Sequence, residues 1–196
     1  MASNVAIKQG ISEDDYLLGE LSSEIKHELI DGVACAMAGA SKDHERIAGN
    51  IFVLLHVHLQ NHSCEPFASD VKVKVNEDFF YPDVMVVCED RSENPYYTDS
   101  PTVLVEVLSS STRRMDQTIK RMAYQSIPSL QELVLIEQDF VDVEVCRRSN
   151  DWLSRHYFLG DEFVLESVGL TLSVADIYRR VQNPDMLDYL QQQELS

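Results

Sequence analysis

Cysteine is scarce in this 196-residue chain, and its four copies, Cys35, Cys64, Cys88 and Cys146, lie far apart. No two of them form a CxxC pair, and no histidine stands near them at zinc-finger spacing. The pattern therefore indicates neither a disulfide framework nor structural zinc. Because isolated cysteines of this kind are usually buried and reduced, we expect four free thiols.

Long apolar runs are also missing. No stretch reaches the ~18 uninterrupted apolar residues that a membrane-spanning helix needs, and the first residues hold no basic segment followed by an apolar one. We expect a soluble, cytoplasmic protein with no membrane partner. The length suits one α/β domain, which we place at residues 1–181. An acidic, glutamine-rich tail over residues 182–196 is expected to be loosely held.

Positive charge is in short supply. The 16 lysines and arginines stand against 33 aspartates and glutamates, which gives a formal net charge of −17. Proteins that bind long stretches of DNA usually present a basic surface that releases counterions from phosphate, so the overall charge argues against such a partner. Several basic residues are nevertheless concentrated in two short segments, residues 72–74 and 113–121. A local basic patch on an acidic body is still compatible with the sequence.

Helical and strand periodicities alternate along the chain, which favours a mixed α/β or α+β architecture. Asp31-Gly32 supplies the positive φ angles of a tight turn and predicts an N-terminal β-hairpin. Helices are predicted at residues 14–21, 41–61, 112–125 and 174–181, with Ser12 and Ser173 as caps of the first and last. Strands are predicted at residues 26–30, 33–37, 71–75, 84–87, 103–108, 133–136 and 141–145, with one more around 152–159.

Two carboxylates stand in places where burial is expected. Residues 84–87 and 103–108 are continuous apolar runs, typical of strands covered on both faces. Glu106 lies inside the second run, and Asp83 follows Pro82 directly before the first. An uncompensated buried carboxylate is costly, so a cation must lie near Glu106. If the two strands are neighbours, a divalent cation between the acids resolves their repulsion, and all-oxygen ligation indicates Mg²⁺ or Mn²⁺.

A plainer interpretation of these acids is open as well. Asp83 could cap a turn, and Glu106 could face solvent on an edge strand. The helix behind them carries Asp116, Lys120 and Tyr124 at every fourth position, and these form one row along the helix. That row is either a surface ion pair worth roughly half a kcal/mol, or it directs Lys120 toward the metal site, where it would orient the attacking water or the scissile phosphate.

Several ordered motifs resemble the Uma-type restriction endonuclease family of bacteria. They are residues 81–84 (YPDV), 105–109 (VEVLS) and 111–114 (STRR), followed by Asp116, Lys120 and Tyr124. The similarity extends to residues 26–32 (KHELIDG), to His44 and Asn50, and to residues 127–129 (IPS), so it covers most of the chain. It implies the PD-(D/E)XK superfamily and a restriction-endonuclease-like fold, in which a central mixed sheet flanked by helices carries the metal site.

Carried over residue by residue, the resemblance makes Asp83 and Glu106 the metal-binding acids and adds Glu28 of the hairpin as a further acid. The chain departs from the superfamily pattern at one position. The name implies a lysine two residues after the second acid, where this chain has Leu108. Lys120 is our candidate replacement, and the departure also leaves room for an inactive relative.

Three histidines are candidates for chemistry. His44, at the start of the long predicted helix, could act as a general base, although a partly exposed polar residue is the expected role at that position. His58 and His62 have the i, i+4 spacing of a metal pair. No acidic third ligand of the HExxH type accompanies them, so we expect structural roles.

Four basic residues are candidates for nucleic-acid binding: Lys72, Lys74, Arg113 and Arg114. Lys72 and Lys74 share the polar face of one predicted strand, where they either contact phosphate or keep the sheet surface soluble. Residues 95–97 (PYY) lie in a loop between the two acidic strands. They could stack on a base, but a packed loop is the favoured interpretation.

These features predict a Mg²⁺- (or Mn²⁺-) dependent endonuclease that hydrolyses phosphodiester bonds in nucleic acid, with DNA as the leading substrate. Asp83 and Glu106, helped by Glu28, would hold the metal, and Lys120 would orient the nucleophile. The alternative is an inactive module of the same fold that binds nucleic acid or a protein, and an enzyme acting on another anionic substrate is a third. By analogy with relatives that cut two strands through two copies, we expect a homodimer.

Overall fold

The computed structural model describes residues 10–90, 92–110 and 112–194. Its centre is a six-stranded sheet in the order β11-β10-β9-β8-β6-β3. Strands β8 and β9 are parallel and the other neighbours antiparallel, so the sheet is mixed, as predicted. The strands are β3 (Glu65–Ala68), β6 (Val84–Val87), β8 (Val103–Leu108), β9 (Glu132–Glu137), β10 (Val143–Arg147) and β11 (Ser154–Tyr157).

A second sheet of five strands has the order β2-β1-β5-β4-β7. Its first two strands form the predicted hairpin, and Asp31 and Gly32 in the turn have φ angles of 49° and 73°. Residues 81–83 connect β5 with β6 and so lead the chain from this sheet to the larger one. The strands are β1 (His27–Ile30), β2 (Val33–Ala36), β4 (Lys72–Val75), β5 (Asp78–Phe80) and β7 (Tyr97–Thr98).

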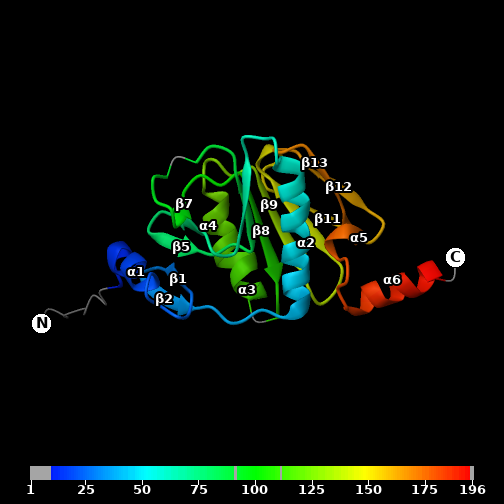
Figure 1. Ribbon diagram of the computed structural model, residues 1–196, viewed down its shortest axis with the longest axis horizontal. Coiled ribbons are helices and arrows are strands. Elements are labelled where there is room, and N and C mark those ends of the chain that lie inside the picture. The colour runs from blue at the N-terminus through cyan, green and yellow to red at the C-terminus, as the bar shows by residue number, and fades with distance from the viewer. Residues whose placement is uncertain (1–9, 91, 111, 195–196) are drawn as a thin grey trace, which may run out of the picture.

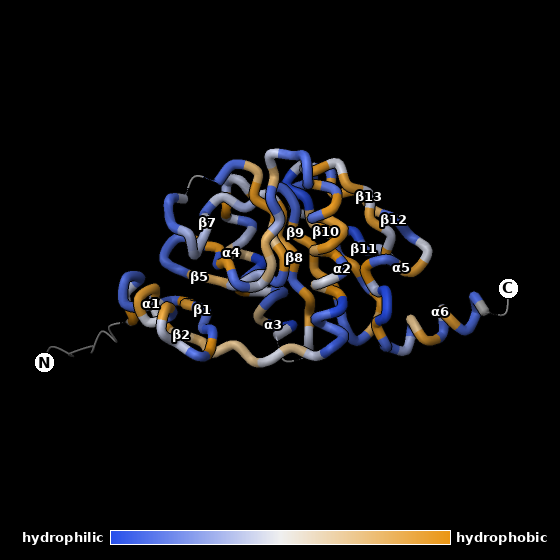
Figure 2. The backbone as a smooth tube through the Cα atoms, viewed as in Figure 1, coloured by the Kyte–Doolittle hydropathy of each residue, from blue (hydrophilic) through white to orange (hydrophobic). Residues whose placement is uncertain are grey.

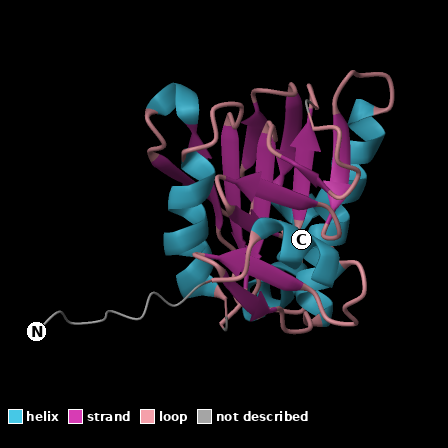
Figure 3. Cartoon of the chain, turned by 90° about the vertical axis from the view of Figure 1, so that its left-hand side faces the viewer, coloured by secondary structure: helices cyan, strands magenta, loops and turns pink. Residues whose placement is uncertain are grey.

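Helices cover both faces of the six-stranded sheet (Figures 1 and 3). On one face lies α2 (Lys42–Leu59), which begins after Ser41, whose hydroxyl accepts a hydrogen bond from the His44 amide at 3.1 Å. Its buried stripe, Ile47, Ile51 and Leu55, packs against valines of β6 and β8. The most apolar part of the chain is accordingly its central strands (Figure 2).

The opposite face is covered by a helix with three parts: α3 (Arg113–Met115), a π-helical turn η1 (Asp116–Lys120) and α4 (Arg121–Gln125). The sequence predicted this helix but not the wider central turn, in which the Arg121 amide reaches back to the Asp116 carbonyl. Such turns are short and frequent at functional sites.

The remaining elements lie at the ends of the chain. Helix α1 (Glu13–Glu20) begins after the predicted cap, Ser12, and β12 (Glu162–Leu165) pairs with β13 (Leu170–Ser173). Helix α5 (Val174–Ile177) follows Ser173, whose side chain makes no capping hydrogen bond. The chain ends in α6 (Pro184–Glu194), which projects from the body (Figure 1). In the described part of the chain, no helix is long and apolar enough to cross a membrane.

The expectation of four free thiols is wrong for two of them. Cys64 and Cys88 form a disulfide, whereas Cys35 and Cys146 are free. Strand β3, which the sequence did not predict, pairs with β6 so that Glu65 lies opposite Val87. Cys64 and Cys88 are therefore the next pair along the same ladder. The sequence did not indicate this pairing because the two cysteines are 24 residues apart.

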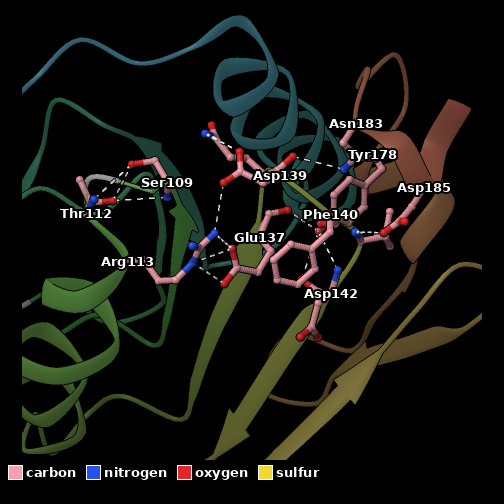
Figure 4. Close-up of polar contacts among 12 residues, drawn as sticks. Ser109, Thr112, Arg113, Glu137, Asp139, Phe140, Asp142, Tyr178, Asn183 and Asp185 are labelled. Carbon is pink, nitrogen blue, oxygen red and sulfur yellow. Dashed lines mark hydrogen bonds and ion pairs between the residues drawn. The ribbon is translucent and has the colours of Figure 1, made fainter.

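The tail is held at its start rather than loose throughout (Figure 4). Asp185 accepts a hydrogen bond from the Val141 amide at 2.7 Å, and Asn183 donates to the Gln138 carbonyl at 3.2 Å. The Tyr178 hydroxyl donates to the Glu137 carbonyl at 2.6 Å. These bonds fix the loop between β9 and β10 to the segment that precedes and begins α6.

Candidate active site

Glu106 lies on β8, in the interior of the six-stranded sheet, and is only 3% exposed. Side chains alternate along a strand. Val105 and Val107 pack on the α2 side, and Leu104 and Leu108 on the α4 side, so Glu106 points toward α4. The interpretation of Glu106 as a solvent-facing residue of an edge strand is therefore excluded.

Asp83 stands directly before β6, the antiparallel neighbour of β8. Val84 pairs with Val105, which brings Asp83 beside the Glu106 segment. Its Oδ2 atom accepts a hydrogen bond from the Val107 amide at 2.7 Å, and its side chain is 15% exposed. The two acids thus come from adjacent central strands, as their positions in the two apolar runs predicted.

Lys120 lies among three carboxylates. Its Nζ atom is 2.8 Å from Glu28 Oε1, 3.2 Å from Glu106 Oε1 and 3.4 Å from Asp116 Oδ1. The Tyr124 hydroxyl donates to Glu106 Oε1 at 2.6 Å. All members of the helix row are buried, so the interpretation of Asp116 and Lys120 as a surface ion pair is wrong.

Glu28 contributes a further carboxylate from β1 and is 4% exposed. Besides Lys120, its Oε1 atom accepts a hydrogen bond from the Tyr81 amide at 3.1 Å. The hairpin, the central sheet and the helix over it therefore each supply charged groups to one cluster, and β1 reaches it from the second sheet.

Negative charge is in excess in this cluster. Burial raises the pKa of Glu106 well above its ordinary value, and Asp116, Asp83 and Glu28 raise it further against the opposing effect of Lys120. Burial likewise raises the pKa of Asp116. For Lys120, the surrounding carboxylates outweigh burial, so its pKa is raised and it stays protonated. Three carboxylates contact one ammonium group and Asp83 lies near them, an imbalance that a divalent cation would offset.

The donor chemistry fits Mg²⁺ or Mn²⁺. Among the residues that the structure describes, no three His, Cys, Asp or Glu side chains form a ready-made metal cage. Mg²⁺ does not need one, because it is usually held by one or two carboxylates together with waters and substrate phosphate. Asp83 and Glu106 offer such a pair.

His44 lies closer to the site than sequence reasoning expected. Its Nε2 atom is 3.4 Å from Asp83 Oδ2, its Nδ1 atom is buried without a partner in the described structure, and its side chain is 14% exposed. Burial lowers the pKa of His44, but the Asp83 carboxylate outweighs burial and the net shift is upward. The sequence signal for this location was the position of His44 in the first turn of α2, just after the Ser41 cap.

The four residues predicted to bind nucleic acid do not form one free basic surface. Lys74 pairs with Glu13, and Arg113 binds Glu137 through Nε at 2.9 Å and Nη2 at 2.5 Å (Figure 4). Lys72, expected on a polar face, is 5% exposed, and Arg114 is exposed.

His58 of α2 and His62 just beyond its end make local contacts. His58 Nε2 lies 2.9 Å from the Val168 carbonyl, and its ring stacks on His62 with centroids 5.2 Å apart.

Comparison with solved structures gives the class of the fold. The crystal structure of a "putative nuclease belonging to DUF820" from Anabaena variabilis matches with a TM-score of 0.73, over 88% of this chain and 99% of that one, at 17% identity. The fold is the restriction-endonuclease-like fold of the PD-(D/E)XK superfamily.

The sequence assigns the family. The profile of the Uma2 family, described as "Putative restriction endonuclease", matches residues 13–175, and the chain belongs to this nuclease family. Two uncharacterized proteins of Synechocystis sp. are similar. The first, slr1290, is 34% identical over 86% of this chain and 92% of its own length; the second, sll1609, is 35% identical over 76% and 88%.

Proposed function

We propose that this protein is a Mg²⁺-dependent endonuclease that hydrolyses phosphodiester bonds in nucleic acid, with DNA as the leading substrate. The observation that supports this most directly is the juxtaposition of Asp83 and Glu106 on adjacent strands, with Lys120 Nζ 3.2 Å from Glu106 Oε1. Leu108 occupies the position of the superfamily lysine. Lys120 instead brings an ammonium group to Glu106 from the helix that covers this face of the sheet.

Each residue has a distinct task in this proposal. Asp83 and Glu106 would hold the metal, which would supply a nucleophilic water and neutralise charge on the phosphate. Lys120 donates hydrogen bonds to the attacking water or to the phosphate oxygens, where negative charge develops. Glu28 and Asp116 hold the ammonium group in place, and the Tyr124 hydroxyl fixes the Glu106 carboxylate.

The test is cleavage of supercoiled plasmid, single-stranded DNA and RNA with Mg²⁺, Mn²⁺ or EDTA. Wild type should cut only with metal, and Asp83→Asn and Glu106→Gln should each lose roughly a hundredfold or more in rate, because one ligand of a two-carboxylate site is gone. Glu132→Gln is the matched control: it removes a buried carboxylate of the same sheet that pairs with Arg147 outside the site. Unchanged cleavage by the two site variants would overturn the assignment.

An inactive binding module is the second candidate. It is favoured by Lys120, which already offsets part of the carboxylate charge, and by the ion pairs that engage Lys74 and Arg113. Calorimetry separates the two functions. Heat of Mg²⁺ binding that is lost in Glu106→Gln supports the endonuclease, whereas no binding and no cleavage of any substrate would support the module.

A homodimer follows from the proposal if both strands of a duplex are cut, because each site would serve one strand. Sedimentation velocity with and without duplex DNA measures this directly. A single copy on duplex that is nevertheless cut in both strands would contradict the dimer.

A further inference from the structure

A pocket of about 300 Å³ lies between α1 and the segment before β7. Asp14, Leu17 and Leu18 of α1 form one side together with Leu21 at its end. Asn94, Pro95 and Tyr96 form the other side, and Lys72 of β4 contributes to the lining. The volume is at the lower end of the range of small-ligand sites. The active-site proposal assigns no role to this space.

Both walls of the pocket are anchored to the second sheet. On the α1 side, the Tyr16 ring packs on Phe79 with centroids 5.2 Å apart, and Glu13 pairs with Lys74. On the other side, the Lys72 amide donates to the Tyr96 carbonyl at 3.1 Å. The pocket is therefore built into the fold rather than left between two independent loops.

Lys72 is the unusual member of the lining. It is 5% exposed, and within the described residues its ammonium group makes no hydrogen bond and no ion pair. Its contact is with the Tyr81 ring, 5.0 Å from the centroid. The nearby Glu20 carboxylate is already bound by His27 Nδ1 at 2.9 Å and by the Tyr81 hydroxyl at 3.0 Å. Lys72 forms no ion pair within the described residues, although the Glu20 charge attracts it and Asp14 lines the same pocket. Because burial of a cation is costly, an anion bound beside Lys72 would be stabilised.

Apart from Asp14 and Asn94, the rest of the lining is suited to a flat apolar group. Tyr96 is 51% exposed, and Leu18 and Leu21 are 69% and 60% exposed. Exposed aromatic rings are the platforms on which proteins stack unpaired bases. An apolar platform beside a buried ammonium group matches a base and its phosphate.

Tyr81 connects this pocket with the acidic cluster. Its ring contacts Lys72, and its amide donates to Glu28 Oε1 at 3.1 Å. We propose that the pocket binds one nucleotide, with the phosphate on Lys72 and the base against Tyr96 and the α1 leucines. The assignment of that nucleotide to the substrate strand rests on the proposed function, whereas binding of the nucleotide does not.

The experiment measures binding without cleavage. Anisotropy of a short fluorescein-labelled oligothymidylate is recorded in EDTA over a series of salt concentrations, and free thymidine 5′-monophosphate is then added as competitor. Lys72→Met should weaken binding about tenfold and reduce the salt slope by about 0.7, the value for one phosphate contact on a single strand. Arg155→Met removes the same charge from an exposed position on β11, at the far edge of the other sheet, and should leave both values unchanged.

Two exposed positions test the pocket without disturbing the core. Tyr96→Ala should weaken binding roughly tenfold through lost stacking. Leu18→Glu places a carboxylate at the pocket and should weaken it as well, whereas Val53→Glu, the same change at an exposed site on α2, should not. Circular dichroism confirms that each variant is folded.

The outcomes separate this inference from the proposed function. If the three pocket variants bind like their controls while wild type still cuts, the pocket inference is wrong and the endonuclease stands. If wild type cuts no substrate and the pocket variants lose affinity, the endonuclease proposal is wrong and the pocket inference stands. Competition by the free nucleotide that disappears in Lys72→Met shows that the pocket takes a mononucleotide, and loss of oligonucleotide binding alone shows that it takes a strand. Failure of wild type to bind either probe overturns the inference.

Discussion

Lys120 Nζ lies 2.8 Å from Glu28 Oε1, and this contact joins the helix over the central sheet to the N-terminal hairpin. The same ammonium group reaches Glu106 of the central strand. One lysine therefore holds together carboxylates from two sheets.

Removing the charge of Lys120 should destabilise the protein and make its thermal stability depend on bound metal. Lys120→Met leaves Glu28, Glu106 and Asp116 without their common partner, and breaking a buried ion pair costs about 3–5 kcal/mol. Thermal unfolding in EDTA should show the loss, and Mg²⁺ should recover part of it because the cation replaces the missing charge. A melting temperature equal to that of Arg155→Met in EDTA would contradict this role.

The Tyr124 hydroxyl should matter more than its ring. Tyr124→Phe keeps the edge-on contact with Phe80, whose ring centroid lies 5.4 Å away, but removes the hydrogen bond to Glu106. Glu106 Oε1 then keeps only its contact with Lys120. The lost hydrogen bond should cost about 0.5–1.5 kcal/mol, which denaturant unfolding measures. Tyr96→Phe, at an exposed ring, is the control and should cost nothing.

Glu144 should give the protein a pH-dependent contribution to stability. Burial raises the pKa of this carboxyl group, but Ser154 and Arg121 outweigh it and the net pKa is lowered from the ordinary 4.5. The contribution is therefore present above about pH 4.5 and lost as the pH falls through the lowered pKa. Glu144→Gln should cost about 1–3 kcal/mol at neutral pH in urea unfolding, and the cost should shrink as the pH falls below 4.5. A cost independent of pH would show that charge is not involved.

The disulfide should stabilise the protein by restricting the unfolded chain. Reduction of Cys64–Cys88 opens a loop with a sequence separation of 24, and bridges over loops of this size contribute about 2–4 kcal/mol. Wild type and Cys35→Ser should both melt at lower temperature in a reducing agent. Cys64→Ser should melt low with or without it, and no response of wild type would show that the bridge contributes nothing.

Much of the fold could be predicted because local patterns and final environments agree. Val84–Val87 is apolar throughout, and Val103–Leu108 is apolar except for Glu106, because both faces of these strands are covered, by α2 on one side and α4 on the other. A charged residue inside such a run indicates that a compensating group lies beside it, and for Glu106 this group is Lys120. The position of Asp83 directly before the neighbouring strand predicted that it lies near Glu106.

What the sequence concealed depends on partners far along the chain. Glu65–Ala68 became a strand because β6 offered a free edge, and its sequence, with a proline inside, gave no strand signal. Arg113, a candidate for phosphate binding, pairs with Glu137 at the end of β9 and with Asp139 just after it, and the sequence did not indicate these partners. His44 was expected to be partly exposed, and only the packing of α2 against β6 and β8 brings it to Asp83.

The π-helical turn η1 determines whether the side chains after it, such as Tyr124, face Glu106. A residue advances an α-helix by about 100°, and a π turn accommodates one residue more than an α turn does. Had Asp116–Lys120 been wound as ordinary helix, everything after it would be rotated by about that angle relative to α3. Winding this turn as ordinary helix with all its residues kept would therefore move Tyr124 away from Glu106, whereas deleting one residue within the turn would leave the phase of α4 unchanged. Every residue of such a site can thus be present in a relative whose geometry is lost because one turn is wound differently.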